Sequence, residues 1–166
     1  MNIVLCGMMG SGKSTIGRII AKNINSTFCD TDEVIEKKHG KISDIFAHHG
    51  ESYFRELESE TVKEISLLDG LVIATGGGLV LRSENVTLLK EKGKIVFLRA
   101  RLETLEKRLQ ADTTRPLLQA EDGLRSRLKN LLTARTPIYE RVADYTVDVD
   151  EKSAEEIALA IMALME

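Results

Sequence analysis

The stretch Ile3-Val-Leu-Cys-Gly-Met-Met-Gly-Ser-Gly-Lys-Ser14 decides the fold class. Its first four residues form an apolar run of the length of a buried strand, and residues 7–14 read G-x-x-x-x-G-K-S. A helical pattern follows over residues 13–22, with three isoleucines on one face. Between a strand and a helix, such a glycine-rich loop directs backbone N–H groups at phosphate oxygens. The stretch therefore predicts that the phosphates of a nucleotide bind here.

The rest of the chain repeats the alternation of strand and helix. Further strands are predicted at 26–29, 71–74, 95–98 and 145–149, and further helices at 32–38, 42–48, 51–68, 83–91, 102–109, 124–134 and 154–165. Gly40 and Gly50 are expected to break the chain between helices, and Ser43 to cap the helix that it begins. Alternating strands and helices indicate an α/β fold, with a parallel sheet covered by helices on both faces.

Length and composition indicate one ordinary globular domain over residues 1–166, with 43% hydrophobic and 30% charged residues. A net charge of −3 gives no sign of a nucleic-acid partner. No apolar run reaches the roughly 18 residues of a membrane span, and no secretory signal is visible, so we expect no membrane partner and a cytoplasmic location. Cys6 and Cys29 lack metal-ligand spacing and are expected to be buried, reduced thiols. His39, His48 and His49 are expected at the surface, without a role.

Two carboxylates follow the predicted second strand, in Asp30-Thr-Asp32. In an open α/β sheet ligands bind beyond the carboxyl ends of the strands, so both side chains are expected to face the site. One could hold Mg²⁺ through water, and the other could orient or deprotonate an acceptor hydroxyl group. The alternative is that Asp32 only caps the next helix.

Three glycines end the predicted third strand, in Thr75-Gly-Gly-Gly78. They allow a ligand to approach the backbone closely, or they make a tight turn that needs a positive φ. The segment 111–122 has weak periodicity and the length of a lid, and Arg115 lies within it.

Two further arginines stand in Phe54-Arg55 and in Arg135-Thr-Pro-Ile-Tyr139. Their guanidinium groups suit a planar carboxylate. For Arg55 there is a simpler interpretation, because Glu51 and Glu58 lie within helical reach and would hold it in a surface salt bridge.

In their order and spacing, these features resemble the shikimate kinase family over almost the whole chain. The resemblance rests on the phosphate loop, Asp30-Thr-Asp32, Phe54-Arg55, Gly76-Gly-Gly78, Arg115-Pro-Leu-Leu118 and Arg135-Thr-Pro-Ile-Tyr139. It implies a P-loop kinase fold of the nucleoside monophosphate kinase type, with a central five-stranded parallel sheet. A substrate-binding segment at about 31–60 and a lid at about 111–122 would complete the domain.

The resemblance also implies a reaction and a set of site residues. ATP would phosphorylate the 3-hydroxyl of shikimate, a step of aromatic amino acid biosynthesis, with Mg²⁺ as cofactor. Apart from the resemblance, we expect a monomer. ATP would be bound by Gly10, Ser11, Gly12, Lys13, Ser14, Thr15, Arg115 and Arg108, the last near the adenine, and Mg²⁺ by Ser14 and, through water, Asp30. Shikimate would be bound by Asp32, Arg55, Gly76, Gly77, Gly78 and Arg135, and the catalytic groups would be Lys13, Asp32 and Arg115.

Other functions remain compatible with the phosphate loop. A gluconate kinase or another small-metabolite kinase would share the fold. A nucleoside monophosphate kinase is disfavoured, because Gly76–Gly78 and the two carboxylates do not suggest a pocket for a base. From a different class, the chain could be a nucleotide-dependent switch or binding module. A guanine-specific switch should carry N-K-x-D, which this sequence lacks.

Overall fold

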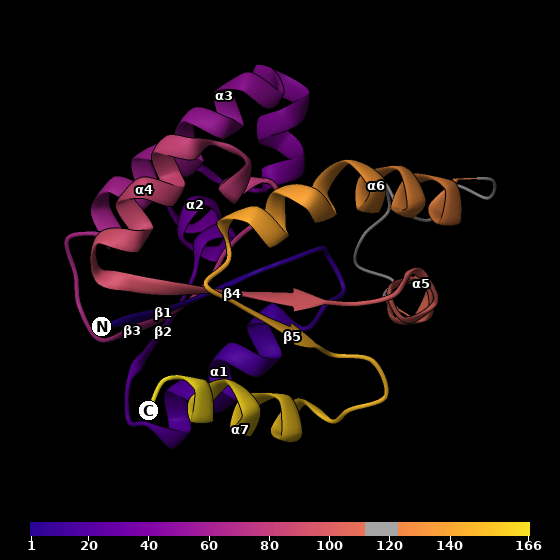
Figure 1. Ribbon diagram of the computed structural model, residues 1–166. Coiled ribbons are helices and arrows are strands. Elements are labelled where there is room, and N and C mark those ends of the chain that lie inside the picture. Colours follow the sequence, from indigo (N-terminus) through magenta and orange to yellow (C-terminus); the bar gives the residue numbers. More distant parts are fainter. Residues whose placement is uncertain (112–122) are drawn as a thin grey trace.

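A five-stranded parallel sheet forms the centre of the molecule (Figure 1). The computed structural model describes residues 1–111 and 123–166, so the predicted lid and its Arg115 lie outside the described residues. In spatial order the strands are β2 (Thr27–Asp30), β3 (Leu71–Ala74), β1 (Asn2–Cys6), β4 (Gly93–Arg99) and β5 (Tyr145–Asp148). All four neighbouring pairs are parallel, which confirms the predicted sheet.

Helices cover both faces of this sheet, as expected (Figure 1). On one face lie α2 (Thr31–His39), α3 (Ile42–Ile65), α4 (Ser83–Lys92) and α6 (Leu124–Val142), together with a short 3-10 turn η1 (Leu79–Leu81). On the other face lie α1 (Lys13–Asn23) and α7 (Ala154–Leu164), packed against each other. The helix α5 (Leu102–Gln110) stands beyond the carboxyl end of β4 (Figure 1).

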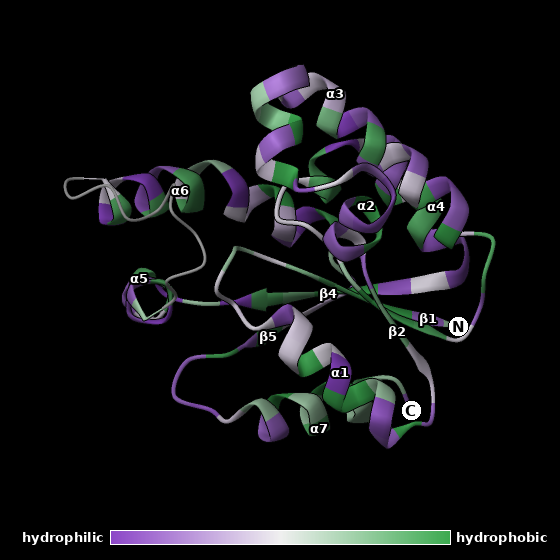
Figure 2. Ribbon diagram, turned by 180° about the vertical axis from the view of Figure 1, so that it is seen from behind, coloured by the Kyte–Doolittle hydropathy of each residue, from purple (hydrophilic) through white to green (hydrophobic). Residues whose placement is uncertain are grey.

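The main hydrophobic core lies on both sides of the central strands. Every residue of β1 and β3 is buried, as the continuous apolar runs of a doubly covered sheet require. Figure 2 shows β1 as a hydrophobic segment, whereas α2, α3 and α4 carry hydrophilic and hydrophobic residues side by side. A second, smaller cluster of Ile35, Ile45, Phe54 and Leu57 holds α2 against α3. This cluster gives the α2–α3 unit a core of its own beside the sheet.

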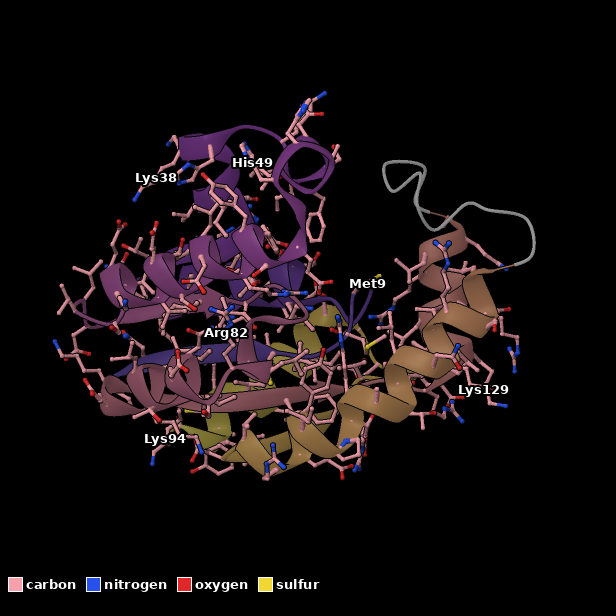
Figure 3. The ribbon with its side chains drawn as sticks, turned by 90° about the horizontal axis from the view of Figure 1, so that it is seen from above. Met9, Lys38, His49, Arg82, Lys94 and Lys129 are labelled. Atoms are coloured by element: carbon pink, nitrogen blue, oxygen red, sulfur yellow. The ribbon has the colours of Figure 1, made fainter. Side chains whose placement is uncertain are left out.

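The junction between α3 and α4 is tied by Arg82 (Figure 3). Its Nη1 donates hydrogen bonds to Glu56 at 2.8 Å and to Ser59 at 3.2 Å. His49, at the far end of the α2–α3 unit, is exposed, and so are His39 and His48, which confirms the expected surface position of all three (Figure 3).

Three local predictions need correction. The helix predicted over 124–134 continues to Val142 and includes Pro137, so Arg135 lies on a helix rather than after one. Ser43 does not cap α3, which starts after Lys41 without a side-chain cap. Cys6 is buried as expected, and burial raises the pKa of its thiol to about 12, but Cys29 is only half-buried. The predicted break at Gly50 is confirmed as a kink within α3, where φ is 82°.

Within residues 1–111 and 123–166, none of the helices combines the length and the apolar character needed to cross a membrane.

Candidate active site

A cavity of about 380 Å³ opens at the carboxyl ends of β1, β2 and β3. The phosphate loop, here residues 7–14, forms one side, and the residues after β2 and β3 form another. Arg108 of α5 and the first turn of α7 complete the lining. This is the edge at which parallel sheets bind their ligands, and the lining of the cavity brings Lys13 and Ser14 of the loop together with Asp32, Gly76 and Gly77.

The phosphate loop has the backbone conformation that its glycines predict. Gly10 and Gly12 have φ values of 82° and 95°, in the left-handed region that favours glycine. Gly12 immediately precedes α1, so the loop presents the N-terminal end of that helix to the cavity. The Nζ of Lys13 donates hydrogen bonds to the carbonyl oxygens of Gly7 at 2.7 Å and Met8 at 3.0 Å, which holds the ammonium group over the loop.

A pair of oxygen-bearing side chains joins the loop to β2. The Ser14 hydroxyl donates a hydrogen bond of 2.6 Å to Oδ2 of Asp30. The other oxygen, Oδ1, accepts from the backbone N–H of Asp32 at 2.9 Å and Glu33 at 3.3 Å. Asp30, not Asp32, therefore caps α2, and the alternative interpretation of Asp32 as the cap is wrong.

The three glycines after β3 allow charged side chains to approach the backbone. The chain turns here, with the N–H of Leu79 donating to the carbonyl of Gly76 at 3.2 Å, but none of the three glycines has the positive φ of the alternative interpretation. A Cβ at Gly76 would lie 2.8 Å from Oδ1 of Asp32, and one at Gly77 would lie 3.0 Å from Nη1 of Arg135. A Cβ at Gly78 would overlap the guanidinium group of Arg55. Side chains from α2, α3 and α6 thus converge on one short stretch of main chain.

Arg55 is held by an ion pair that is largely buried. Its Nη1 donates to Oε1 of Glu58 at 2.6 Å, and its Nη2 lies 3.3 Å from Glu51. The predicted ion pairs exist, but the surface location is wrong, because the side chains of Arg55 and Glu58 are only 18% and 1% exposed. Burial disfavours the charge of Arg55, but the hydrogen bonds and charges of Glu58 and Glu51 together outweigh it and raise the pKa of the guanidinium.

Glu58 is a buried carboxylate whose place in the site the sequence analysis missed. Burial raises its pKa, and the nearby charge of Asp32 adds to the rise, while Arg55 opposes it. Its second oxygen, Oε2, has no hydrogen-bond partner among the described residues and would lie 3.0 Å from a Cβ at Gly76. In the sequence, the spacing of three residues indicates that Glu58 can pair with Arg55, but it does not indicate that the pair is buried.

Two further groups that the sequence analysis did not assign hold the glycines in place. The Thr31 hydroxyl accepts a hydrogen bond from the N–H of Gly76 at 2.9 Å. The phenol of Tyr139 donates one of 2.6 Å to the carbonyl of Gly77. Tyr139 belongs to the motif Arg135-Thr-Pro-Ile-Tyr139, but its contact with a residue 62 positions away is visible only in the fold.

Arg108 lies on the nucleotide side of the cavity. Its Nη1 donates to the carbonyl oxygen of Gly10 at 3.2 Å. Ala154 and Ile157 of α7 line the same part of the cavity and supply apolar surface. Contact between Arg108 and adenine stays a prediction.

Comparison with known proteins agrees with this geometry. The family model for shikimate kinase matches residues 9–166. A shikimate kinase from Thermodesulfovibrio yellowstonii is 48% identical over 162 residues, which are 97% of this chain and 92% of that protein. The solved shikimate kinase from Acinetobacter baumannii in complex with shikimate is 39% identical, with a TM-score of 0.92 over 99% of this chain and 92% of that one. A gluconokinase from Sinorhizobium meliloti, 21% identical with a TM-score of 0.62 over 99% of this chain and 92% of that one, shares the fold alone.

Proposed function

The chain belongs to the shikimate kinase family, and from this premise we propose that it transfers the γ-phosphoryl group of ATP to the 3-hydroxyl of shikimate. The products are 3-phosphoshikimate and ADP. One observation carries the assignment to this site: Arg55 and Arg135 approach adjacent glycines beside Asp32, at the edge of the sheet that also holds the phosphate loop. Two guanidinium groups suit a carboxylate, which shikimate carries on the same ring as its hydroxyl groups.

On the acceptor side, we assign the carboxylate of shikimate to Arg55 and Arg135 and its hydroxyl groups to Asp32. Asp32 lines the same cavity as Lys13 and Ser14, so a hydroxyl bound to it faces the phosphate loop. A carboxylate in this place can orient the attacking hydroxyl and accept its proton. The backbone of Gly76–Gly78 would complete the acceptor site.

On the donor side, we assign the phosphates of ATP to residues 10–15. Phosphoryl transfer depends mainly on positioning and on neutralising charge, and Lys13 supplies a positive charge directly over the loop. Arg108 is assigned to the adenine side of the cavity. Arg115 lies outside the described residues, and its proposed closure on the phosphates rests on the sequence.

Ser14 and Asp30 fit a magnesium ion. Both offer oxygen atoms, the ligands that Mg²⁺ prefers, and the ion usually takes only one or two of them from protein besides phosphate and water oxygens. The two side chains already meet at 2.6 Å beside the phosphate loop. When bound, Mg²⁺ would neutralise charge on the β- and γ-phosphates.

We propose a monomer that acts in the cytoplasm, with ATP and shikimate as its small-molecule partners. These proposals rest on the sequence expectations given above. A gluconate kinase is the nearest rival, because gluconate also carries a carboxylate and hydroxyl groups.

An acceptor assay separates these functions. The purified chain is given ATP and Mg²⁺, and ADP formation is followed with shikimate, with gluconate and without an acceptor. We expect ADP formation to depend on shikimate and to stay at background with gluconate. Equal rates without an acceptor would indicate a nucleotide-binding module or switch, and a preference for gluconate would indicate the rival kinase.

A further inference from the structure

Tyr139 is fully buried on α6, one helical turn after Arg135. Its ring stacks on Phe97 of β4, with the ring centroids 5.0 Å apart, and its hydroxyl donates a hydrogen bond of 2.6 Å to the carbonyl oxygen of Gly77. Residues four apart lie on the same face of a helix, so Arg135 and Tyr139 both point toward the glycines. The side chain thus links a strand of the sheet, α6 and the main chain at the proposed acceptor site.

The hydrogen bond to Gly77 is one of several that fix this stretch of main chain. Thr31 of α2 accepts from the N–H of Gly76 at 2.9 Å. On the other side, the side-chain amide of Asn85 in α4 donates a hydrogen bond of 2.9 Å to the carbonyl oxygen of Leu79. Tyr139 holds the residue between these two anchors, which is also the glycine that Arg135 approaches.

We propose that Tyr139 is a positioning residue for the acceptor: through the Gly77 carbonyl it fixes the main chain against which Arg135 presents its guanidinium group to the acceptor carboxylate. The inference rests on the proposed function, since it concerns the same site. A carbonyl held by a buried donor cannot turn toward the cavity, where it would face the negative charge of the carboxylate. The hydroxyl therefore acts on acceptor affinity without touching the acceptor.

The phenol is suited to this task over a wide range of pH. Burial raises the pKa of Tyr139 to about 12, although the positive charge of Arg135 opposes the rise. The hydroxyl therefore keeps its proton and remains a donor. Because the ring is held by Phe97, removing the oxygen alone leaves the packing in place.

The test is Tyr139→Phe, with Tyr145→Phe as a matched control. Tyr145 begins β5 and packs partly buried against the core, away from the glycines. Leaving a buried carbonyl without its donor should raise the shikimate KM by roughly 5- to 30-fold. The ATP KM should not change, and neither KM should change in Tyr145→Phe. Thermal melts of the three proteins report on folding.

A purely structural role predicts another pattern, in which the melting temperature falls and both KM values stay as in the wild type. An unchanged shikimate KM in a folded Tyr139→Phe protein would overturn the inference, and so would an equal rise in both KM values. If Tyr139→Phe does not fold, Thr31→Val, which deletes the anchor on Gly76, must raise the shikimate KM selectively for the inference to stand.

A double-mutant cycle makes the link to Arg135 explicit. If both residues act through the same contact, the rise in shikimate KM for Tyr139→Phe combined with Arg135→Ala should be smaller than the product of the single effects. Independent, multiplicative effects would contradict the inference. Failure of the proposed function would look different, because the wild type itself would then show no shikimate-dependent ADP formation.

Discussion

The guanidinium group of Arg55 contacts both a buried carboxylate and the main chain after β3. Nη1 donates to the buried Glu58, and the same group lies against Gly78. The ion pair fixes the guanidinium before any ligand arrives, and a group that is already in place loses less conformational entropy on binding. The contact with Glu58 therefore prepares Arg55 for a second anion.

We expect Arg55→Ala and Arg135→Ala each to weaken shikimate binding strongly. Each change removes charge-assisted hydrogen bonds worth about 1.5–3 kcal/mol. This corresponds to a rise of roughly 10- to 150-fold in the shikimate KM. Arg55→Lys should recover only part of the loss, because an ammonium group cannot make the planar two-pronged contact. Steady-state kinetics with shikimate varied at saturating ATP measure the effect.

The ATP KM is the internal control for these variants, since neither arginine is assigned to the phosphates. Thermal melts show whether loss of the Glu58 ion pair has destabilised Arg55→Ala. If both alanine variants keep the wild-type shikimate KM, the two arginines do not bind the carboxylate.

Glu58 should give the stability of the protein a distinctive pH dependence. Burial raises the pKa of its carboxyl group above the ordinary value of 4.5, so the folded protein holds this proton more tightly than the unfolded chain. Stability from this group is present below pH 4.5 and is lost as the pH rises through the folded pKa. Glutamine does not titrate, so the unfolding free energy of Glu58→Gln minus that of the wild type should increase as the pH rises from 4.5.

Denaturant unfolding at a series of pH values measures this difference. Glu60→Gln is the control, because it removes an exposed carboxylate from the same helix. The informative quantity is how the difference in unfolding free energy between Glu58→Gln and the wild type changes with pH. Loss of the ion pair with Arg55 adds a contribution of its own to that difference. A difference between Glu58→Gln and the wild type that stays constant with pH would contradict the raised pKa.

For single residues, the sequence predicted which side chains lie at the cavity better than it predicted their burial and their contacts. Lys13, Ser14 and Asp32 line the cavity because each follows a strand that the apolar pattern reveals, while their roles stay predictions. The burial of Glu58 and the contact of Tyr139 with Gly77 were missed. Both depend on how α3 and α6 pack over the end of β3, and neither periodicity nor local spacing contains that information.

Among the elements, α6 departs most from its prediction. Pro137 removes a helical hydrogen bond and usually ends or bends a helix, so the sequence predicted an end at Ala134. The helix continues because it packs on α5, η1 and β4, with Leu128 and Tyr139 buried. Tertiary packing overrides the local preference and brings Arg135 to the site on a rigid element.

The contact between α1 and β2 offers a test at the same scale. A Cβ at Gly17 would lie 2.5 Å from the ring of Phe28, so Gly17→Ala forces the helix and the strand apart. Overpacking of this kind destabilises proteins by about 1–3 kcal/mol. We expect a lower unfolding free energy in denaturant melts, with Lys22→Ala, an exposed position on the same helix, as the control. If Gly17→Ala is as stable as the wild type, α1 and β2 are not packed as closely as described.

For the molecule as a whole, the architecture followed from the sequence because a phosphate loop and alternating elements leave few topologies. Parallel strands need crossover helices, and these cover both faces of the sheet. The carboxyl ends of β1, β2 and β3 then lie side by side, which places the donor residues of the loop beside the acceptor residues of α2, α3 and α6. The strand order itself, with β3 between β2 and β1, required the structure.

We propose above all that one phosphoryl group moves from ATP to one hydroxyl of shikimate within this cavity. Identifying the product tests the claim most directly: the purified chain is incubated with ATP, Mg²⁺ and shikimate, and the phosphorylated position is determined by NMR. We expect a single phosphate ester at the 3-hydroxyl, formed in step with ADP. Release of free phosphate with shikimate unchanged, or an ester at another hydroxyl, would contradict it.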